Sequence, residues 1–127
     1  MRKHLNLALV VALLALVYVS SAYAYRSPTR SERRQIVAAI DRFLYTQNCA
    51  PTHTCNPKVT NIRVSLANQT FATAHLFAPK VGSALALLHR KYGTWRLTDL
   101  GTQFVGCSGK APKAVRVDLE LTCPGGR

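Results

Sequence analysis

The hydrophobic positions change their spacing along the chain, and each spacing predicts a different kind of element. Over residues 31–44 they recur at intervals of three and four, which is typical of a helix with one buried face. These apolar side chains are Ile36, Val37, Ile40, Phe43 and Leu44. Ser31 suits the N-cap, and residues 25–29 before it form a short polar lead-in. The helix should end near residues 45–48, because the loop 49–57 contains two prolines.

After this loop the spacing changes to two, which is typical of strands with one buried face. The chain then offers four such runs, at residues 59–66, 70–78, 83–91 and 94–100. One side of the second run carries Phe71, Thr73, His75 and Phe77. A short turn joins the first run to the second, and the turn Tyr92-Gly93 joins the third to the fourth. Trp95, in the fourth run, should point inward. The order predicts an α+β fold in which the N-terminal helix packs on a four-stranded antiparallel sheet.

The last segment, residues 111–123, fits two elements equally well. Alternation favours a strand, since every second residue from 115 to 121 is apolar. A short helix is equally compatible, because Pro112 suits a first helical position and Val115 and Leu119 follow it at spacings of three and four. Periodicity alone leaves both open.

The first 24 residues are typical of a signal peptide. Arg2 and Lys3 precede an apolar stretch at residues 5–19, and the segment ends in the small-x-small pattern Ala22-Tyr23-Ala24. The apolar stretch is shorter than the ~20 residues that span a bilayer. We therefore expect cleavage after Ala24 and a single exported domain, residues 25–127, with no membrane span of its own.

All four cysteines lie in the exported part, where thiols normally oxidise. Four cysteines allow three pairings, and proximity favours Cys49–Cys55 together with Cys107–Cys123. A metal site at Cys49, His53 and Cys55 is the alternative, but it offers three ligands where structural zinc takes four. We expect two disulfides, no metal and no cofactor.

The positive net charge of the chain indicates a candidate partner, an anionic surface or polymer. The 127 residues include 17 Lys and Arg against 5 Asp and Glu, a net charge of +12. Four arginines lie on or just before the predicted helix: Arg30, Arg33, Arg34 and Arg42. They could bind an anionic envelope polymer or lipid head groups, or they could simply solvate the surface. Aromatic residues make up 8% and fall in strand patterns, so a base-stacking platform for specific nucleic-acid binding is not indicated.

No catalytic motif stands out, but three residues could line a pocket. His75 and His89 lie on predicted strands, and Asp99 follows Trp95 near the end of another. If they meet in a cavity, a small hydrolase or isomerase is the alternative to a binding protein. Inhibition of a protease or glycosidase through the loop 49–55 is a third possibility. The stretch Q-I-V-A-A at residues 35–39 resembles the Q-x-V-x-G loop of cystatins, yet it falls inside the predicted helix.

The second half of the chain carries a resemblance. The stretch G-T-W-R-L-T-D-L-G-T at residues 93–102 is followed by V-G-C and then by A-P-K-A-V-R-V-D-L-E-L-T-C-P. This pattern resembles small exported proteins of bacteria, notably of actinobacteria, across nearly all of the exported part. The resemblance implies a short C-terminal helix and a curved, cone-shaped sheet of the cystatin-like or nuclear-transport-factor-like sort. It carries no activity, so we expect a secreted basic domain that binds something or has a structural role.

These expectations fix the covalent state of the exported protein. Its intact mass should correspond to a chain that begins at Tyr25 and is lighter by four hydrogens, as two disulfides require. Digestion without reductant should link Cys49 to Cys55 and Cys107 to Cys123. Free thiols in the exported protein, or a retained metal ion, would contradict the expectation.

Overall fold

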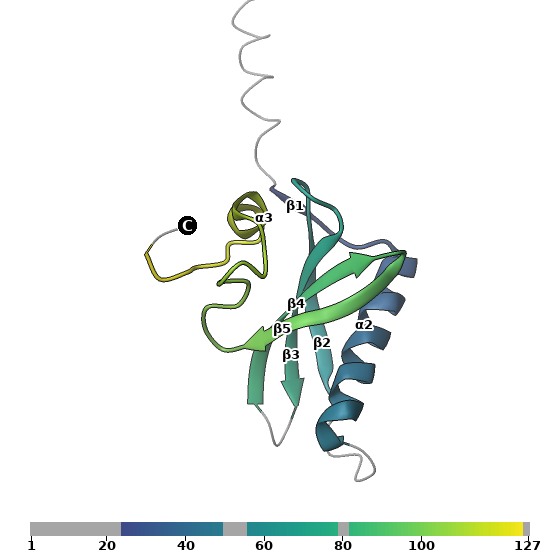
Figure 1. Cartoon of the computed structure of the whole chain (residues 1–127). Coiled ribbons are helices and arrows are strands. Elements are labelled where there is room, and N and C mark those ends of the chain that lie inside the picture. The colour runs from purple at the N-terminus through teal and green to yellow at the C-terminus, as the bar shows by residue number, and fades with distance from the viewer. Residues whose placement is uncertain (1–23, 50–55, 79–81, 126–127) are drawn as a thin grey trace, which may run out of the picture.

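A computed structural model of the chain describes residues 24–49, 56–78 and 82–125 (Figure 1). The elements in chain order are β1 (Tyr25–Arg26), α2 (Arg30–Leu44), the π-helical turn η1 (Tyr45–Cys49), β2 (Lys58–Ser65), β3 (Phe71–Ala78), β4 (Gly82–Lys91), β5 (Thr94–Gly101) and α3 (Lys113–Asp118). The strands form one antiparallel sheet in the order β1-β2-β3-β4-β5. The predicted α+β class and antiparallel sheet are therefore confirmed.

The predicted count of four strands is wrong, because the lead-in contributes a fifth. Tyr25 pairs with Ser65 and Arg26 with Val64, so β1 adds an edge to β2. Two residues are too short a run for alternation to indicate a strand. The guanidinium of Arg26 holds the segment in place through two hydrogen bonds to the carboxylate of Glu32, at 2.8 and 2.9 Å.

The start of α2 also differs from the prediction. Thr29, not Ser31, is the N-cap: its hydroxyl accepts a hydrogen bond from the backbone N–H of Glu32 at 3.1 Å. The carboxylate of Glu32 accepts one in return from the N–H of Thr29 at 2.9 Å. This reciprocal pair is a capping box, and it satisfies two backbone donors that the helix itself leaves free. Glu32 therefore serves both the cap and the Arg26 clamp.

One face of the sheet packs against α2. The helix buries Ile36, Ala39 and Ile40, as the three-and-four spacing predicts. Opposite them lies every second residue of β3, and Trp95 at the start of β5 is only 1% exposed. The inward position of Trp95 is thus confirmed. It places the first residues of β5 against the helix.

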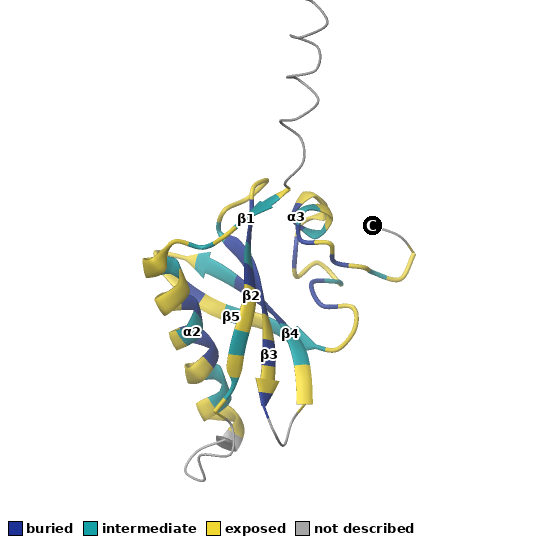
Figure 2. Cartoon of the chain, turned by 180° about the vertical axis from the view of Figure 1, so that it is seen from behind, coloured by how far each residue is buried: buried dark blue, intermediate teal, exposed yellow. Residues whose placement is uncertain are grey.

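The other face of the sheet is covered by the C-terminal segment. Phe71 of β3 and Leu87 of β4 point to this side and are buried under a second apolar cluster. The cluster is completed by Val105, Ala111, Val115, Leu119 and Leu121. Both views show the sheet lying between α2 and the segment that carries α3 (Figures 1 and 2). The fold therefore has three layers where the C-terminal segment covers the sheet, and two layers elsewhere.

The C-terminal segment turns out to be a short helix that continues as extended chain. Residues 113–118 form α3 directly after Pro112, which confirms the implied helix and decides against a strand. One predicted disulfide, Cys107–Cys123, is present with the two Cα atoms 5.7 Å apart. The other predicted pair, Cys49–Cys55, lies outside the residues whose side chains the structure describes.

Replacing Trp95 with Ala should lower the free energy of unfolding by roughly 3–5 kcal/mol, because the change empties an aromatic core site between helix and sheet. Denaturant titration of both proteins measures the difference. Tyr45→Ala is the matched control, since that ring is 71% exposed and its loss should cost less than about 0.5 kcal/mol. A loss below about 1 kcal/mol for W95A would contradict the packing.

The double role of Glu32 predicts a pH-dependent stability. Hydrogen bonds from Arg26, against the opposing effect of burial, lower the pKa of Glu32 from 4.5 to about 2. The stabilisation is therefore complete above pH 4.5 and is lost as the pH falls through 2. Glu32→Gln should cost about 2 kcal/mol at neutral pH, and the difference from wild type should shrink in acid.

Glu120→Gln provides the control for this measurement, because Glu120 pairs with Arg63 at 3.1 Å but is 65% exposed. Exposed pairs contribute little, so its loss should have a small effect at any pH. Equal pH profiles of unfolding for wild type and E32Q would show that the carboxylate does not act as described.

Candidate functional site

The three residues predicted as a possible pocket do not come together. His75 of β3 lies opposite Leu85 of β4, whereas His89 lies opposite Phe71, four residues further back along β3. That offset separates the two histidines by roughly 13 Å along the strand direction. Asp99 of β5 lies opposite Leu87, between the two positions. Register alone keeps the histidines out of each other's reach.

One of the two histidines is packed in the fold, and the other is exposed. The ring of His89 stacks on Phe71, with the centroids 3.9 Å apart and the planes 8° apart. Burial, and secondarily the positive charge of Lys91, lower the pKa of His89 below its ordinary value. His89 is therefore neutral at neutral pH and part of the packed face. His75 is exposed on the sheet.

Asp99 holds the loop that follows β5. Its carboxylate accepts hydrogen bonds from the backbone N–H of Gly106 at 2.9 Å and from Lys110 Nζ at 3.1 Å. Burial alone would raise the pKa of Asp99, but these hydrogen bonds outweigh it and hold the pKa below its usual range. Gly106 has a positive φ of 83°, and a Cβ there would lie 2.8 Å from Leu121. The site is a tightly built loop anchor, and its carboxylate is not free to act as a base.

The described ranges offer neither a cluster of metal ligands nor a membrane-spanning helix. Residues 24–49, 56–78 and 82–125 contain no group of three His, Cys, Asp or Glu side chains that could hold a metal ion. No helix in these same ranges is both long and apolar enough to cross a membrane. The loop 49–55, considered above for metal binding and for inhibition, lies outside the described residues apart from the backbone of Cys49.

The predicted anion-binding arginines fall into two groups along α2. Arg30, Arg33 and Arg34 occupy the first turns of the helix and are exposed. Arg42 is also exposed, but it lies eight residues beyond Arg34, or about 12 Å along the axis. None of the four makes an ion pair with any residue that the structure describes.

The first group is extended by the β4–β5 hairpin. Both views place the turn between β4 and β5 beside the first turns of α2 (Figures 1 and 2). The packing of Trp95 and Ile36 in one core cluster explains this position. We call the resulting surface the basic corner, and its residues are Arg30, Arg33, Arg34, Arg90 and Lys91.

The acidic residues do little to neutralise this surface. All five lie in the described ranges, and four form hydrogen bonds with other parts of the chain: Glu32, Asp99, Asp118 and Glu120. Glu32 is the one nearest the start of α2, and its charge is matched by Arg26. Asp41 is exposed on α2 beside Arg42. The positive charge of the corner is therefore left uncompensated at short range.

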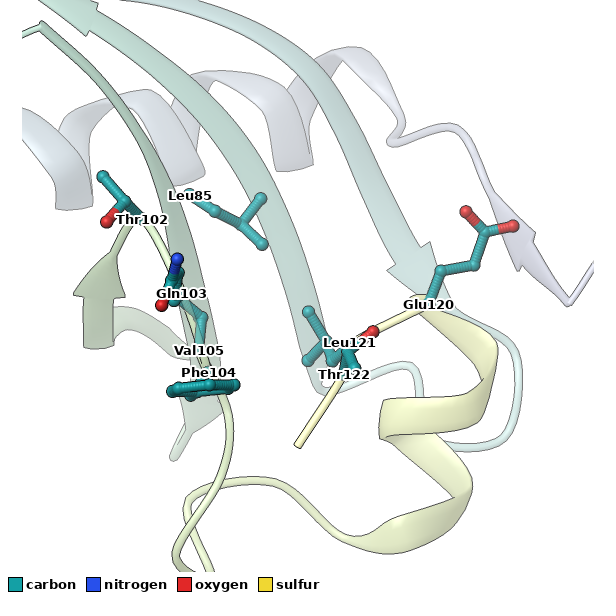
Figure 3. A pocket seen from close by; sticks show the side chains of 8 residues that line it. All are labelled: Leu85, Thr102, Gln103, Phe104, Val105, Glu120, Leu121 and Thr122. Atoms are coloured by element: carbon teal, nitrogen blue, oxygen red, sulfur yellow. The ribbon is translucent and has the colours of Figure 1, made fainter. Parts of the chain in front are cut away.

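Two open clefts lie away from the corner. One, of about 270 Å³, is bounded by β4 and by residues 102–105 and 120–122 (Figure 3). The other, of about 390 Å³, lies between the second half of α2 and β5, where Arg42, Phe43 and Leu97 are part of its lining. Neither cleft contains His75, His89 or Asp99. The clefts thus lend no support to the predicted catalytic pocket.

Sequence reasoning missed an exposed aromatic residue that lies beside the corner. Tyr92 is assigned only to a turn by its position next to Gly93, yet its side chain is fully exposed at the tip of the hairpin. Its φ is 52°, and that of Gly93 is 76°. A bulky residue with positive φ is unusual, because such positions favour Gly, Asn or Asp. An aromatic residue before Gly in a predicted two-residue turn was the signal available.

Comparison of the chain with models of known protein families, with curated protein sequences and with solved structures finds no match in any of the three. The resemblance to small exported bacterial proteins, and the cone-shaped fold that it implies, therefore stay predictions.

Proposed function

We propose that the protein is an exported, disulfide-stapled domain that attaches to anionic surfaces of the cell envelope through its basic corner. The observation that carries the proposal is that the β4–β5 turn lies beside the first turns of α2 (Figure 1), which brings two segments that carry Lys and Arg to one end of the molecule. Such a cluster concentrates positive potential and attracts polyanions or anionic head groups.

The distribution of the remaining charges supports this assignment. Basic residues elsewhere are partly used inside the fold: Lys110 binds Asp99, and Arg116 donates to the carbonyl of Ala111 at 2.7 Å. In the corner, by contrast, no cation is paired with a carboxylate that the structure describes. The corner is therefore a place where the excess of basic over acidic residues can act on a partner.

A pocket enzyme is less well supported by the geometry. It would need convergent polar groups at the bottom of a cavity. Here Asp99 is bound by Gly106 and Lys110, and His89 is stacked on Phe71. The proposed assignment is therefore a binding protein. The exported state and the second disulfide belong to the same proposal, since oxidised cysteines are typical of exported chains.

Reversing two charges of the corner should weaken attachment. Arg33→Glu with Arg34→Glu should reduce retention on immobilised polyphosphate and on phosphatidylglycerol vesicles by roughly tenfold at low salt, because each neutralised phosphate releases a counterion. Wild-type retention should also fall steeply with salt. Both side chains are exposed, so the unfolding midpoint should change little.

The matched control reverses the same number of charges elsewhere. Lys58 begins β2 and Lys113 begins α3, and both are exposed. Lys58→Glu with Lys113→Glu lowers the net charge equally, so it should reduce retention much less if the corner is the contact. Equal losses for the two double variants would show that net charge alone acts. Absence of wild-type retention at low salt would remove the proposal.

A further inference from the structure

The turn between β4 and β5 carries an aromatic residue that the fold does not use. The relative exposure of Tyr92 is 104%, so its ring packs against nothing in its own chain. Arg90, two residues earlier, lies over the ring of Trp95 at 5.6 Å from the centroid. Packing therefore explains the neighbouring residues of the hairpin but does not explain the tyrosine.

The turn itself does not favour tyrosine either. Positive φ at both Tyr92 and Gly93 has the signs of a type I′ turn, where Asn-Gly is the preferred pair. A side chain with a Cβ pays a conformational penalty there, and a large ring returns no contact for it. A contact outside the chain would account for the residue.

The surroundings of Tyr92 narrow the chemistry of that contact. Lys91 precedes it and is exposed. The turn lies beside the first turns of α2 (Figure 2), which carry the exposed arginines of the basic corner. Tyrosine has an apolar ring and a polar hydroxyl, which suits the boundary between head groups and acyl chains. Cations beside such a ring are attracted to anionic lipids. A linear polyanion would bind the cations but would offer the ring no apolar environment.

We propose that Tyr92 inserts into the head-group region of an anionic lipid bilayer while the basic corner binds the lipid phosphates. This inference rests on the proposed function and adds that the surface it recognises is a membrane. The tip of the hairpin then is the deepest point of contact. The cationic residues of the basic corner then lie around it at the level of the phosphates.

Tyr92→Asn tests the inference without endangering the fold, since Asn suits a positive φ better than Tyr. Its unfolding midpoint should be equal to or above that of wild type. Partitioning onto mixed phosphatidylglycerol and phosphatidylcholine vesicles should fall roughly tenfold, through the loss of buried aromatic area. Retention on immobilised polyphosphate should not change. Tyr45→Asn is the matched control, because that exposed tyrosine follows α2 at its far end.

A second measurement reports how deeply the side chain at position 92 enters the bilayer. In Tyr92→Trp the introduced indole should shift its emission to the blue and become protected from an aqueous quencher on the anionic vesicles, but not on pure phosphatidylcholine vesicles. The native Trp95 is buried and should contribute a constant signal.

The outcomes separate the two proposals. If Y92N partitions onto vesicles as wild type does, or if the introduced indole stays quenchable there, membrane insertion is wrong while salt-sensitive binding to polyphosphate still supports the basic corner. If Y92N loses polyphosphate and vesicle binding equally, the ring contacts the anion itself and the bilayer assignment is overturned. If wild type binds neither support at low salt, the proposed function fails as well.

Discussion

The central strands have an apolar surface on both sides, and the rest of the structure depends on covering both. Alternate residues of β3 and β4 face α2, and Phe71 and Leu87 face the opposite way. A single helix covers one face, so the other requires the C-terminal segment. That segment has only the six-residue helix α3, too short to be stable by itself. It is therefore tied down by the Cys107–Cys123 disulfide and by two carboxylates, those of Asp99 and Asp118.

This way of holding the fold accounts for the charge of the surface. Asp118 accepts hydrogen bonds from Ser65 Oγ at 2.9 Å and from the N–H of Ala67 at 2.6 Å, and thereby joins α3 to the β2–β3 turn. Asp99 fixes the loop after β5, and Glu32 joins β1 to α2. With few acidic residues in the chain, these internal duties leave the exposed arginines without partners. The basic corner follows from where the carboxylates are needed.

The sequence predicts the elements better than it predicts the contacts between them. Spacing identified α2 and the four long strands, because each buries a regular face over eight residues or more. It left residues 111–123 open for a physical reason: Val115 and Leu119 are buried with helical spacing, and Leu119 and Leu121 with strand spacing, so both patterns are real.

The features that the sequence did not predict are local hydrogen bonds and contacts between distant segments. Ser31 suits an N-cap by its residue type, but the T-x-x-E pattern that begins at Thr29 marks the actual cap, and β1 is too short to carry a pattern. The arginines of α2 could be picked out from the sequence as candidates. Their meeting with Lys91 and Tyr92 could not, because it depends on how β5 packs against the helix.

The chemistry of the corner implies that salt, and not pH, controls any attachment there. Arginine keeps its charge throughout the physiological range. The nearby carboxylate of Glu32 has a pKa of about 2 and stays ionised and paired with Arg26. His89, on the strand that leads to the turn, stays neutral at neutral pH because burial and Lys91 lower its pKa. Ionic strength, by contrast, screens every exposed cation of the corner.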